Sequence, residues 1–284
     1  MHNVIHFIEH VTFDTLKLVP FLFLTYLVME ALEHKAGERT HNVVKKAGRL
    51  GPVVGSLVGA VPQCGFSAAA SNLYAGRVIT LGTLMAIYLS TSDEMLPIMI
   101  SEKVPFAIIL GILGIKVFVG MMAGLLIDVV LSGRGDDHHH IHEMCEDENC
   151  HCEKGILVSA LIHTLHITIF ILLINFMLEL LLNTIGEEVL GQMILNRPIV
   201  GQLIAGLVGL IPNCASSVVI TQLYLEEALS LGAMMSGLLV NAGIGVLILF
   251  RVNKDRKENI KIVCLLYVIG VLAGIGLGFL PIQL

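Results

Sequence analysis

The sequence predicts an all-α membrane protein, a polytopic helix bundle built as an inverted repeat with two proline-broken, re-entrant hairpin segments. Three observations lead to this class: the composition, the lengths of the apolar blocks and an internal duplication. Of 284 residues, 55% are hydrophobic and 14% are charged, with a mean hydropathy of +0.84. Soluble domains carry about 25% charged residues, so the composition indicates a membrane protein. The net charge of -6 is spread over loops and suggests no nucleic-acid partner.

The apolar residues form blocks long enough to cross roughly 30 Å of hydrocarbon, which takes about 20 residues of helix. The N-terminal stretch MHNVIHFIEH lacks the basic region and cleavage site of a signal peptide. We therefore expect the first block to remain as an anchor in a multi-pass protein of the cell membrane. The blocks span residues 13–33, 51–75, 78–100, 104–131, 155–182, 199–225, 228–250 and 262–282.

The two halves of the chain repeat one another at a spacing of 150 positions. VPQCGFS at 61–67 aligns without gaps on IPNCASS at 211–217. This predicts a first membrane repeat (1–131), a polar loop (132–154) and a second membrane repeat (155–284). The aligned pairs are Gly59/Gly209, Pro62/Pro212, Cys64/Cys214, Ser67/Ser217, Tyr74/Tyr224 and Gly82/Gly232, with Asp14 matching His163 one residue out of register.

The loops of the two halves carry opposite charge. Loop 34–49 is basic, whereas its mate 183–198 holds one arginine and two glutamates. Arg77 follows the first Pro-Cys block, while two glutamates follow the second, and Lys103 stands alone where loop 251–261 has five bases. Because basic loops face the cytoplasm, these reversals predict halves of opposite orientation, as in inverted-repeat transporters.

Opposite orientation requires an odd number of crossings in each half, yet each half has four blocks. The blocks 51–75 and 201–225 carry Pro62 and Pro212 near their middle. If each is a hairpin of two half-helices that turns at its proline, each half crosses three times and loop 132–154 lies in the cytoplasm. Eight full crossings are the alternative, but they leave an acidic loop inside and make the repeats parallel.

The broken segments are candidate substrate sites. Non-helical backbone at membrane depth persists only where protein or a water-filled cavity satisfies it, and a helix N-terminus favours an anion or a thiolate. Two tips that meet near mid-membrane would offer thiols to a soft or borderline metal ion. The alternative is a pair of proline kinks with packed cysteines. The predicted site residues are Gln63, Cys64, Ser67, Asn213, Cys214 and Ser217, with Pro62 and Pro212 as hinges.

A second candidate region is LSTSDEMLP, residues 89–97, where Asp93 and Glu94 interrupt an apolar block. A carboxylate inside the membrane costs roughly 2.5–3.5 kcal/mol and is a functional-site hypothesis by default. As consecutive positions of one helix the two would point about 100° apart, so we expect separate roles. Alternatively, the block is shorter and both acids line its mouth. Thr91 and its aligned Asn241 keep this neighbourhood polar.

Loop 132–154 combines histidine, cysteine and acidic residues with almost no apolar side chains. Such tracts are typical of metal binding. No spacing matches a closed structural zinc site, so we expect a loose cytoplasmic metal collector or sensor; a solvated acidic linker is the alternative. The candidate ligands are His138, His139, His140, His142, Cys145, Cys150, His151 and Cys152.

Two histidines stand near the start of the fifth block. His163 and His166 share one face of the predicted helix because they lie three positions apart. Together with Asp14, they are candidate relay or ligand positions. Because these residues lie near block ends, interfacial anchoring is an equal alternative.

The repeated Pro-x-Cys core, together with STSDE at 90–94, resembles the ten-transmembrane heavy-metal exporters, a family distantly similar to the arsenic efflux permeases, with some members labelled manganese transporters. The likeness covers almost the whole chain, and eight blocks become ten segments if each hairpin counts as two. Arsenical permeases carry Pro-x-Cys-x-Cys, whereas the second cysteine position here is Phe66 or Ser216. This departure argues against a three-thiol arsenite site.

The resemblance and the residues together lead us to expect a secondary transporter, not an enzyme, that exports a divalent transition metal such as manganese by proton antiport. No Walker A motif indicates ATP as the driver. The expected partners are the lipid bilayer, the metal ion as substrate and protons, without a cofactor. The alternatives are an arsenite or organoarsenical efflux permease, an intramembrane lipid-pyrophosphate enzyme, which the absence of arginine from both tips disfavours, and a metal-sensing scaffold.

Overall fold

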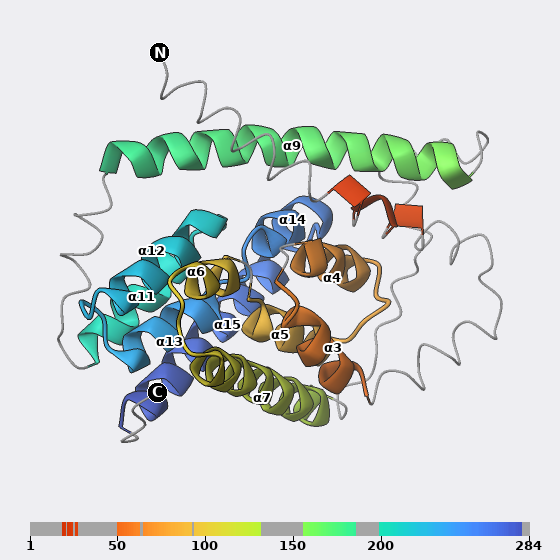
Figure 1. Ribbon diagram of the computed structural model, residues 1–284. Helices are drawn as coiled ribbons and strands as arrows, with labels where there is room; N and C mark the ends of the chain where they lie inside the picture. Colours follow the sequence, from red (N-terminus) through yellow and green to blue (C-terminus); the bar gives the residue numbers. More distant parts are fainter. Residues whose placement is uncertain are drawn as a thin grey trace, which may run out of the picture.

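The computed structural model describes residues 19–20, 22–24, 26–27, 50–62, 65–92, 94–131, 156–185 and 199–279. Over these residues the chain is helical, without strands, which confirms the predicted all-α class of polytopic membrane protein (Figure 1). Within this described part of the chain, three stretches are long and apolar enough to cross a membrane, namely Phe106–Leu131, Leu231–Val252 and Arg256–Gly278.

The helices follow the same order in both halves of the chain. At a spacing of 150 positions, corresponding helices begin within one residue of each other. The long helix α9 precedes the second set and runs along one side of the bundle (Figure 1). The bounds are α3 Gly51–Gly59, α4 Gly65–Ala75, α5 Leu81–Ser90, α6 Met95–Ser101, α7 Phe106–Leu131, α9 Ile156–Ile185, α11 Val200–Gly209, α12 Cys214–Leu225, α13 Leu231–Val240, α14 Gly245–Val252 and α15 Arg256–Gly278.

Matching caps fix the helix ends in the two halves. The Thr80 side chain accepts a hydrogen bond from Thr83 N at the start of α5, and Ser230 does the same for Ala233 N at the start of α13. At the end of α4, Val78 N–H donates to Leu73 O at 2.8 Å while Arg77 takes a left-handed φ of 56°. Ala228 N–H donates to Leu223 O at 2.9 Å beside Glu227, whose φ is 61°. Both are Schellman motifs, which stop a helix sharply.

Each half contains two helix breaks, where only one was expected. The break after α3 holds Pro62 and the break after α11 holds Pro212, as predicted. Blocks 78–100 and 228–250, however, are not single helices, because residues 91–94 and 241–244 interrupt them.

Local side-chain bonding accounts for the additional breaks. Thr91 Oγ1 donates to Ile87 O at 2.8 Å, a back-bond that competes with the helix ladder. Asn241 Oδ1 accepts from Gly243 N at 2.9 Å, and Gly243 has a φ of 54°, the left-handed region that favours glycine. The interpretation of Asp93 and Glu94 as consecutive positions of one helix is therefore wrong for Glu94, which is the N-cap of α6.

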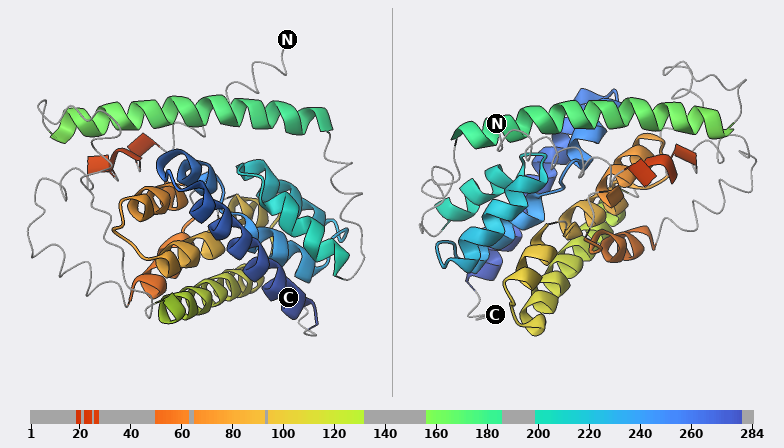
Figure 2. Two further views of the ribbon diagram at one scale, coloured as in Figure 1. Left: turned by 180° about the vertical axis from the view of Figure 1, so that it is seen from behind. Right: turned by 45° about the horizontal axis from the view of Figure 1, so that its top comes forward.

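The two halves interlock rather than stand side by side. Within each half α5 packs on α3 and α7, and α13 packs on α11 and α15. Between halves α4 packs on α14, and α12 packs on α6 (Figures 1 and 2). Each half therefore completes its packing with a helix of the other.

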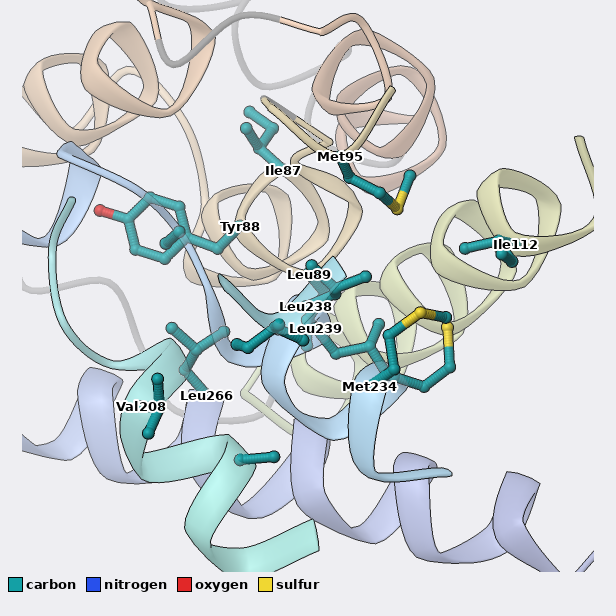
Figure 3. Packing of buried hydrophobic residues seen from close by; sticks show 14 of the residues in the cluster. Ile87, Tyr88, Leu89, Met95, Ile112, Val208, Met234, Leu238, Leu239 and Leu266 are labelled. Atoms are coloured by element: carbon teal, nitrogen blue, oxygen red, sulfur yellow. The ribbon is translucent and has the colours of Figure 1, made fainter. Parts of the chain in front are cut away.

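The core draws on both halves. Its buried members include Tyr88 and Leu89 of α5 and Leu238 and Leu239 of α13. Figure 3 shows Leu89 close to Leu238 and Leu239. A smaller cluster joins α9 to the bundle through Ala160 and Ile167, which pack with Leu22, Tyr26, Ala68, Ile244 and Ile248.

The last helix begins earlier than predicted. Asp255 Oδ1 accepts hydrogen bonds from Lys257 N at 2.9 Å and Glu258 N at 3.1 Å, which caps α15 at Arg256. Arg256, Lys257 and Lys261, which were assigned to a loop, therefore lie in the first turns of α15, and the block starts at 256 rather than 262. Arg251 lies in the last turn of α14. The cap outweighs the low apolarity of this stretch.

Candidate functional site

The structure buries three of the polar residues predicted for the Pro-Cys sites. Ser67 and Ser217 are fully buried, and Asn213 is 5% exposed. Asn213 is the N-cap of α12, and its side-chain oxygen accepts from Ala215 N. Cys214 is the first residue of α12.

Some predicted site residues lie outside the described part of the chain. Gln63, Cys64 and Asp93 are not among the described residues, and the side chain of Cys214 is not described. The meeting of the two thiols therefore stays a prediction. Pro62 is exposed and Pro212 partly buried, each in the break between two helices.

Each Pro-Cys helix packs against the helix that follows the second break of the other half. Ser67 on α4 is so close to α14 that a Cβ on Gly245 would lie 2.8 Å from the Ser67 Cβ. In the mirror arrangement, α12 packs on α6, whose N-cap is Glu94. The structure thus brings the two predicted regions together, each with its partner from the other half.

Ser71 ties three helices together at one of these junctions. Its Oγ lies 2.7 Å from Tyr88 Oη on α5 and donates to Gly245 O of α14 at 2.7 Å. Ser71 and Tyr88 are fully buried. Neither residue stood out in the sequence, because single hydroxyls in an apolar block are ordinary helix-packing residues.

The second pair of breaks is also buried. Thr91 is 2% exposed and Asn241 1% exposed, and Asn241 Nδ2 has no hydrogen-bond partner among the described residues. An unsatisfied amide at this depth is costly. This supports a polar ligand at the break.

Lys116 is the main site residue that the sequence analysis missed. It lies in the middle of α7, is 1% exposed, and its Nζ donates to Thr91 O and, at 2.9 Å, to Leu238 O. A lysine in the middle of a 26-residue apolar helix, whose other charged residue is Asp128 near the end, was the available signal, since a charge at membrane depth is functional by default.

The chain was compared with protein families, curated proteins and solved structures. Residues 6–177 match a family described as "Putative, 10TM heavy-metal exporter". The chain belongs to this family. No curated protein and no solved structure matches.

Membership confirms the resemblance seen in the sequence and supports metal efflux across a membrane as the general function. The match includes the first Pro-Cys segment, the 91–94 break and Lys116, and it ends within α9. The family match therefore covers most of the first repeat, which contains the buried Lys116.

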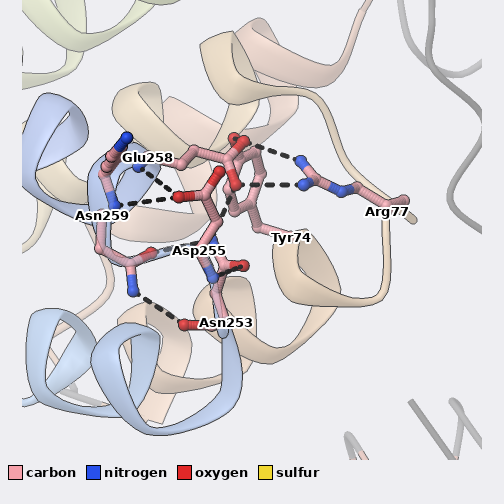
Figure 4. A network of polar contacts seen from close by, with 7 residues as sticks. Tyr74, Arg77, Asn253, Asp255, Glu258 and Asn259 are labelled. Carbon is pink, nitrogen blue, oxygen red and sulfur yellow. Dashed lines mark hydrogen bonds and ion pairs between the residues drawn. The ribbon is translucent and has the colours of Figure 1, made fainter. Parts of the chain in front are cut away.

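A polar network joins the two halves of this exporter-family member at one end of the bundle (Figure 4). Tyr74 Oη donates to Glu258 Oε1 at 2.7 Å, and Arg77 donates to both Glu258 oxygens at 2.9 and 3.0 Å. Asn253 Nδ2 donates to Glu258 Oε2 and Asn259 Oδ1, each at 2.8 Å. The hydrogen bond to Glu258 raises the pKa of the Arg77 guanidinium.

No group of three or more histidine, cysteine or acidic side chains that could hold a metal occurs within the described residues. The predicted metal collector, loop 132–154, lies outside them, as does Asp14. His166 is exposed on α9, and the side chain of His163 is not described. The relay and collector roles therefore remain predictions.

Proposed function

We propose that this chain is a secondary transporter that exports a divalent transition-metal ion such as manganese by proton antiport, through alternating access of its two repeats. The observation that carries the proposal is the pairing of helix breaks from opposite repeats inside the bundle. Discontinuous helices that meet between repeats are the arrangement in which transporters bind substrate and coupling ions.

Two close contacts between α3 and α5 support a hairpin at the first Pro-Cys segment. A Cβ on Gly51 would lie 2.2 Å from Thr83 Oγ1, and one on Gly59 would lie 2.2 Å from Ser90 Oγ. Helices α3 and α5 therefore run in parallel and reach the same depth. For α5 to start where α3 starts, α4 must return to that face, as a re-entrant hairpin does.

The polar network supports inversion of the repeats. Ser67 at the start of α4 contacts Gly245 at the start of α14, and Tyr74 near the end of α4 bonds Glu258 beyond the end of α14. Helix α5 begins at the membrane face where α4 ends and runs away from that face. Helices α13 and α14 run toward the same face. Eight full crossings would place Arg77 and Glu258 on opposite faces, so their ion pair favours the inverted arrangement.

The predicted substrate groups fit a divalent transition metal better than an arsenical. Cys64 and Cys214 would supply thiolates, Asp93 a carboxylate, and the amide and hydroxyl groups around them oxygen donors. The His/Cys loop 132–154 would collect metal at the cytoplasmic face. Export is inferred from the family and from this placement of the loop.

The proposal is tested with purified full-length protein in proteoliposomes under an imposed pH gradient. We expect manganese flux that falls about tenfold or more in Cys64→Ser, Cys214→Ser and Asp93→Asn, since loss of even supporting groups at metal sites costs 10–100-fold. Cys264→Ser is the matched control, because Cys264 is exposed on α15. Unchanged flux in all three site variants would refute the site.

The cargo is resolved by repeating the flux measurement with zinc, cobalt, arsenite and an organoarsenical. Preference for an arsenical over every divalent metal would replace the proposed substrate with the arsenical alternative. Flux that does not respond to the pH gradient would remove proton antiport while leaving export.

A further inference from the structure

We propose that the Arg77–Glu258 ion pair is a latch that closes the cytoplasmic face of the protein, and that Glu227 and Lys103 form the matching latch of the outer face when the cytoplasmic latch opens. This proposal rests on the proposed function, because alternating access of the two repeats supplies the two states. It adds the residues that hold each state.

The cytoplasmic latch joins the end of α4 to the start of α15 (Figure 4). Arg77 follows α4 of the first repeat and donates to both oxygens of Glu258, at 2.9 and 3.0 Å. Glu258 lies in the first turn of α15 of the second repeat, and Asn253 Nδ2 donates to its Oε2 at 2.8 Å. The basic residues of 251–261 indicate that this is the cytoplasmic face. The latch therefore ties the two repeats together at that face.

The internal repeat carries the same junction to the opposite face with the charges exchanged. At a spacing of 150 positions, Arg77 aligns with Glu227. Asn253, which bonds the Glu258 carboxylate, aligns with Lys103. Arg77 and Glu227 also share a left-handed turn, with φ of 56° and 61°. An acid and a base thus occupy the positions at which inverted symmetry predicts a contact.

The outer latch is not formed in this structure. Lys103 and Glu227 are both exposed, and in the part of the chain that the structure describes no ion pair joins them. The position aligned with Glu258 is the apolar Ile108. Lys103 is therefore the residue of this turn that can pair with Glu227.

The packing of the two junctions shows the same asymmetry. Helix α4 packs more extensively on α14 than α12 packs on α6. Asn72 near the end of α4 is fully buried, whereas the aligned Gln222 is exposed. Tyr74 is buried, whereas Tyr224 is only partly buried. One junction is closed and the other partly open, as expected when one repeat rocks against the other.

The cytoplasmic latch is accessible enough to open. The side chains of Arg77 and Glu258 are 40% and 24% exposed. An ion pair at such a site changes an equilibrium by a factor of about five at most, because water screens it. A contribution of this size biases two states without trapping either.

Carbodiimide cross-linking of the purified full-length protein, without cargo, tests the exchange of latches. The reagent condenses an amine with a carboxylate that touches it, so peptide mass spectrometry reports a Lys103–Glu227 pair directly. We expect the yield of this cross-link to rise about fivefold over wild type in Glu258→Gln and in Arg77→Gln, because loss of the cytoplasmic latch favours the other state. Glu227→Gln should abolish the cross-link.

Two further variants separate a latch from a merely structural ion pair. Lys257→Gln is the matched control, since it removes an exposed charge beside Glu258 in the first turns of α15, and its cross-link yield should equal that of wild type. The double variant Arg77→Glu/Glu258→Arg restores the ion pair with its charges exchanged. It should return the yield toward wild type, an effect at one face caused by a pair at the other.

Metal flux in proteoliposomes distinguishes failure of the latches from failure of the proposed function. If wild type shows no flux, the proposed function fails, while cross-linking still decides whether the two latches exchange. If wild type transports metal and the cross-link does not respond to either latch variant, the latches fail alone.

Three results would overturn the latches. One is a Lys103–Glu227 cross-link that is absent, or equally abundant, in wild type, Glu258→Gln and Arg77→Gln. Another is a rise in Lys257→Gln as large as in the latch variants. The third is that neither Glu258→Gln nor Arg77→Gln can be recovered as folded protein, since a latch that opens during transport must be dispensable for folding.

Discussion

The two repeats share a backbone but differ in chemistry. The features that fix the path of the backbone occur in both repeats: a proline at the break, Pro62 or Pro212, and a Schellman turn, at Arg77 or Glu227. Residues that carry charge at depth are not kept: Lys116 corresponds to Leu266. The comparison teaches that the repeats share the residues that fix the path of the chain, while the one buried charged residue in the described part of the chain, Lys116, belongs to the first.

The same division holds along the polar junctions. Ser71 and Tyr88 of the first repeat bond each other and Gly245, whereas the aligned Thr221 has a hydroxyl without a partner among the described residues, and Tyr88 aligns with Leu238. At this junction the second repeat therefore contributes mainly a backbone group, the carbonyl of Gly245. Paired substitutions at aligned positions can test this asymmetry.

The largest effect is expected at the paired glycines that bring helices into contact. A Cβ on Gly209 would lie 2.2 Å from Gly237 O, a backbone atom of α13 that cannot rotate away. Gly209→Ala should lower the free energy of unfolding by about 3 kcal/mol, the upper part of the overpacking range. Gly59→Ala should cost less, because the nearest atom is the movable Ser90 Oγ, although Ile87 O lies 2.6 Å away.

Thermal and denaturant unfolding of the purified variants measures this difference. Gly114→Ala is the control, since nothing lies within 4 Å of its Cβ position. It should be neutral or stabilising by up to about 1 kcal/mol from helix propensity. Equal losses at positions 59 and 209 would contradict the expectation that a Cβ clashes more severely with the Gly237 backbone than with the Ser90 side chain.

An intermediate effect is expected at the paired tyrosines. Tyr74 is 4% exposed and donates to Glu258, so Tyr74→Phe should cost about 1.5 kcal/mol, the lower range for a hydrogen bond to a charged group. Tyr224 is only partly buried, and Tyr224→Phe should be neutral. Denaturant unfolding of both variants checks the difference, and a comparable loss for Tyr224→Phe would place a polar contact in the second repeat as well.

The smallest effect is expected at the second pair of breaks. Asn241→Ala removes the acceptor of Gly243 N and should cost about 1 kcal/mol, while Thr91→Val loses one back-bond and should cost about 0.5 kcal/mol. The thermal unfolding of both variants gives the order. A larger loss for Thr91→Val would show that its hydroxyl does more than bond Ile87 O.

Much of the architecture could be predicted because local sequence features, such as hydropathy and proline positions, determine it. The hydropathy predicts α7 and α9 to within a few residues, and the repeat with its prolines predicts the breaks at 62 and 212. The breaks at 91–94 and 241–244 were not predicted, because apolar residues flank them and they are caused by local side-chain hydrogen bonds. The early start of α15 escaped because a cap, rather than apolarity, sets it.

The site was predicted less completely, for a different reason. Which helices meet across the repeats is not visible in periodicity when helices are apolar on most sides. Without the packing of α7 on α5 and of α5 on α13, Lys116 could not be linked to Thr91 or Leu238. A stricter search for single charges within long apolar blocks would have found the residue, although not its partners.

The exchange of helices between repeats has a consequence for biosynthesis. When the first repeat has left the ribosome, α4 and α6 still lack the neighbours that α14 and α12 provide. The surfaces of α4 and α6 that later contact these neighbours must be protected by the translocon or a chaperone until nearly the whole polypeptide has been made. Separate production of the two halves should thus give fragments that the cell degrades unless both are made together.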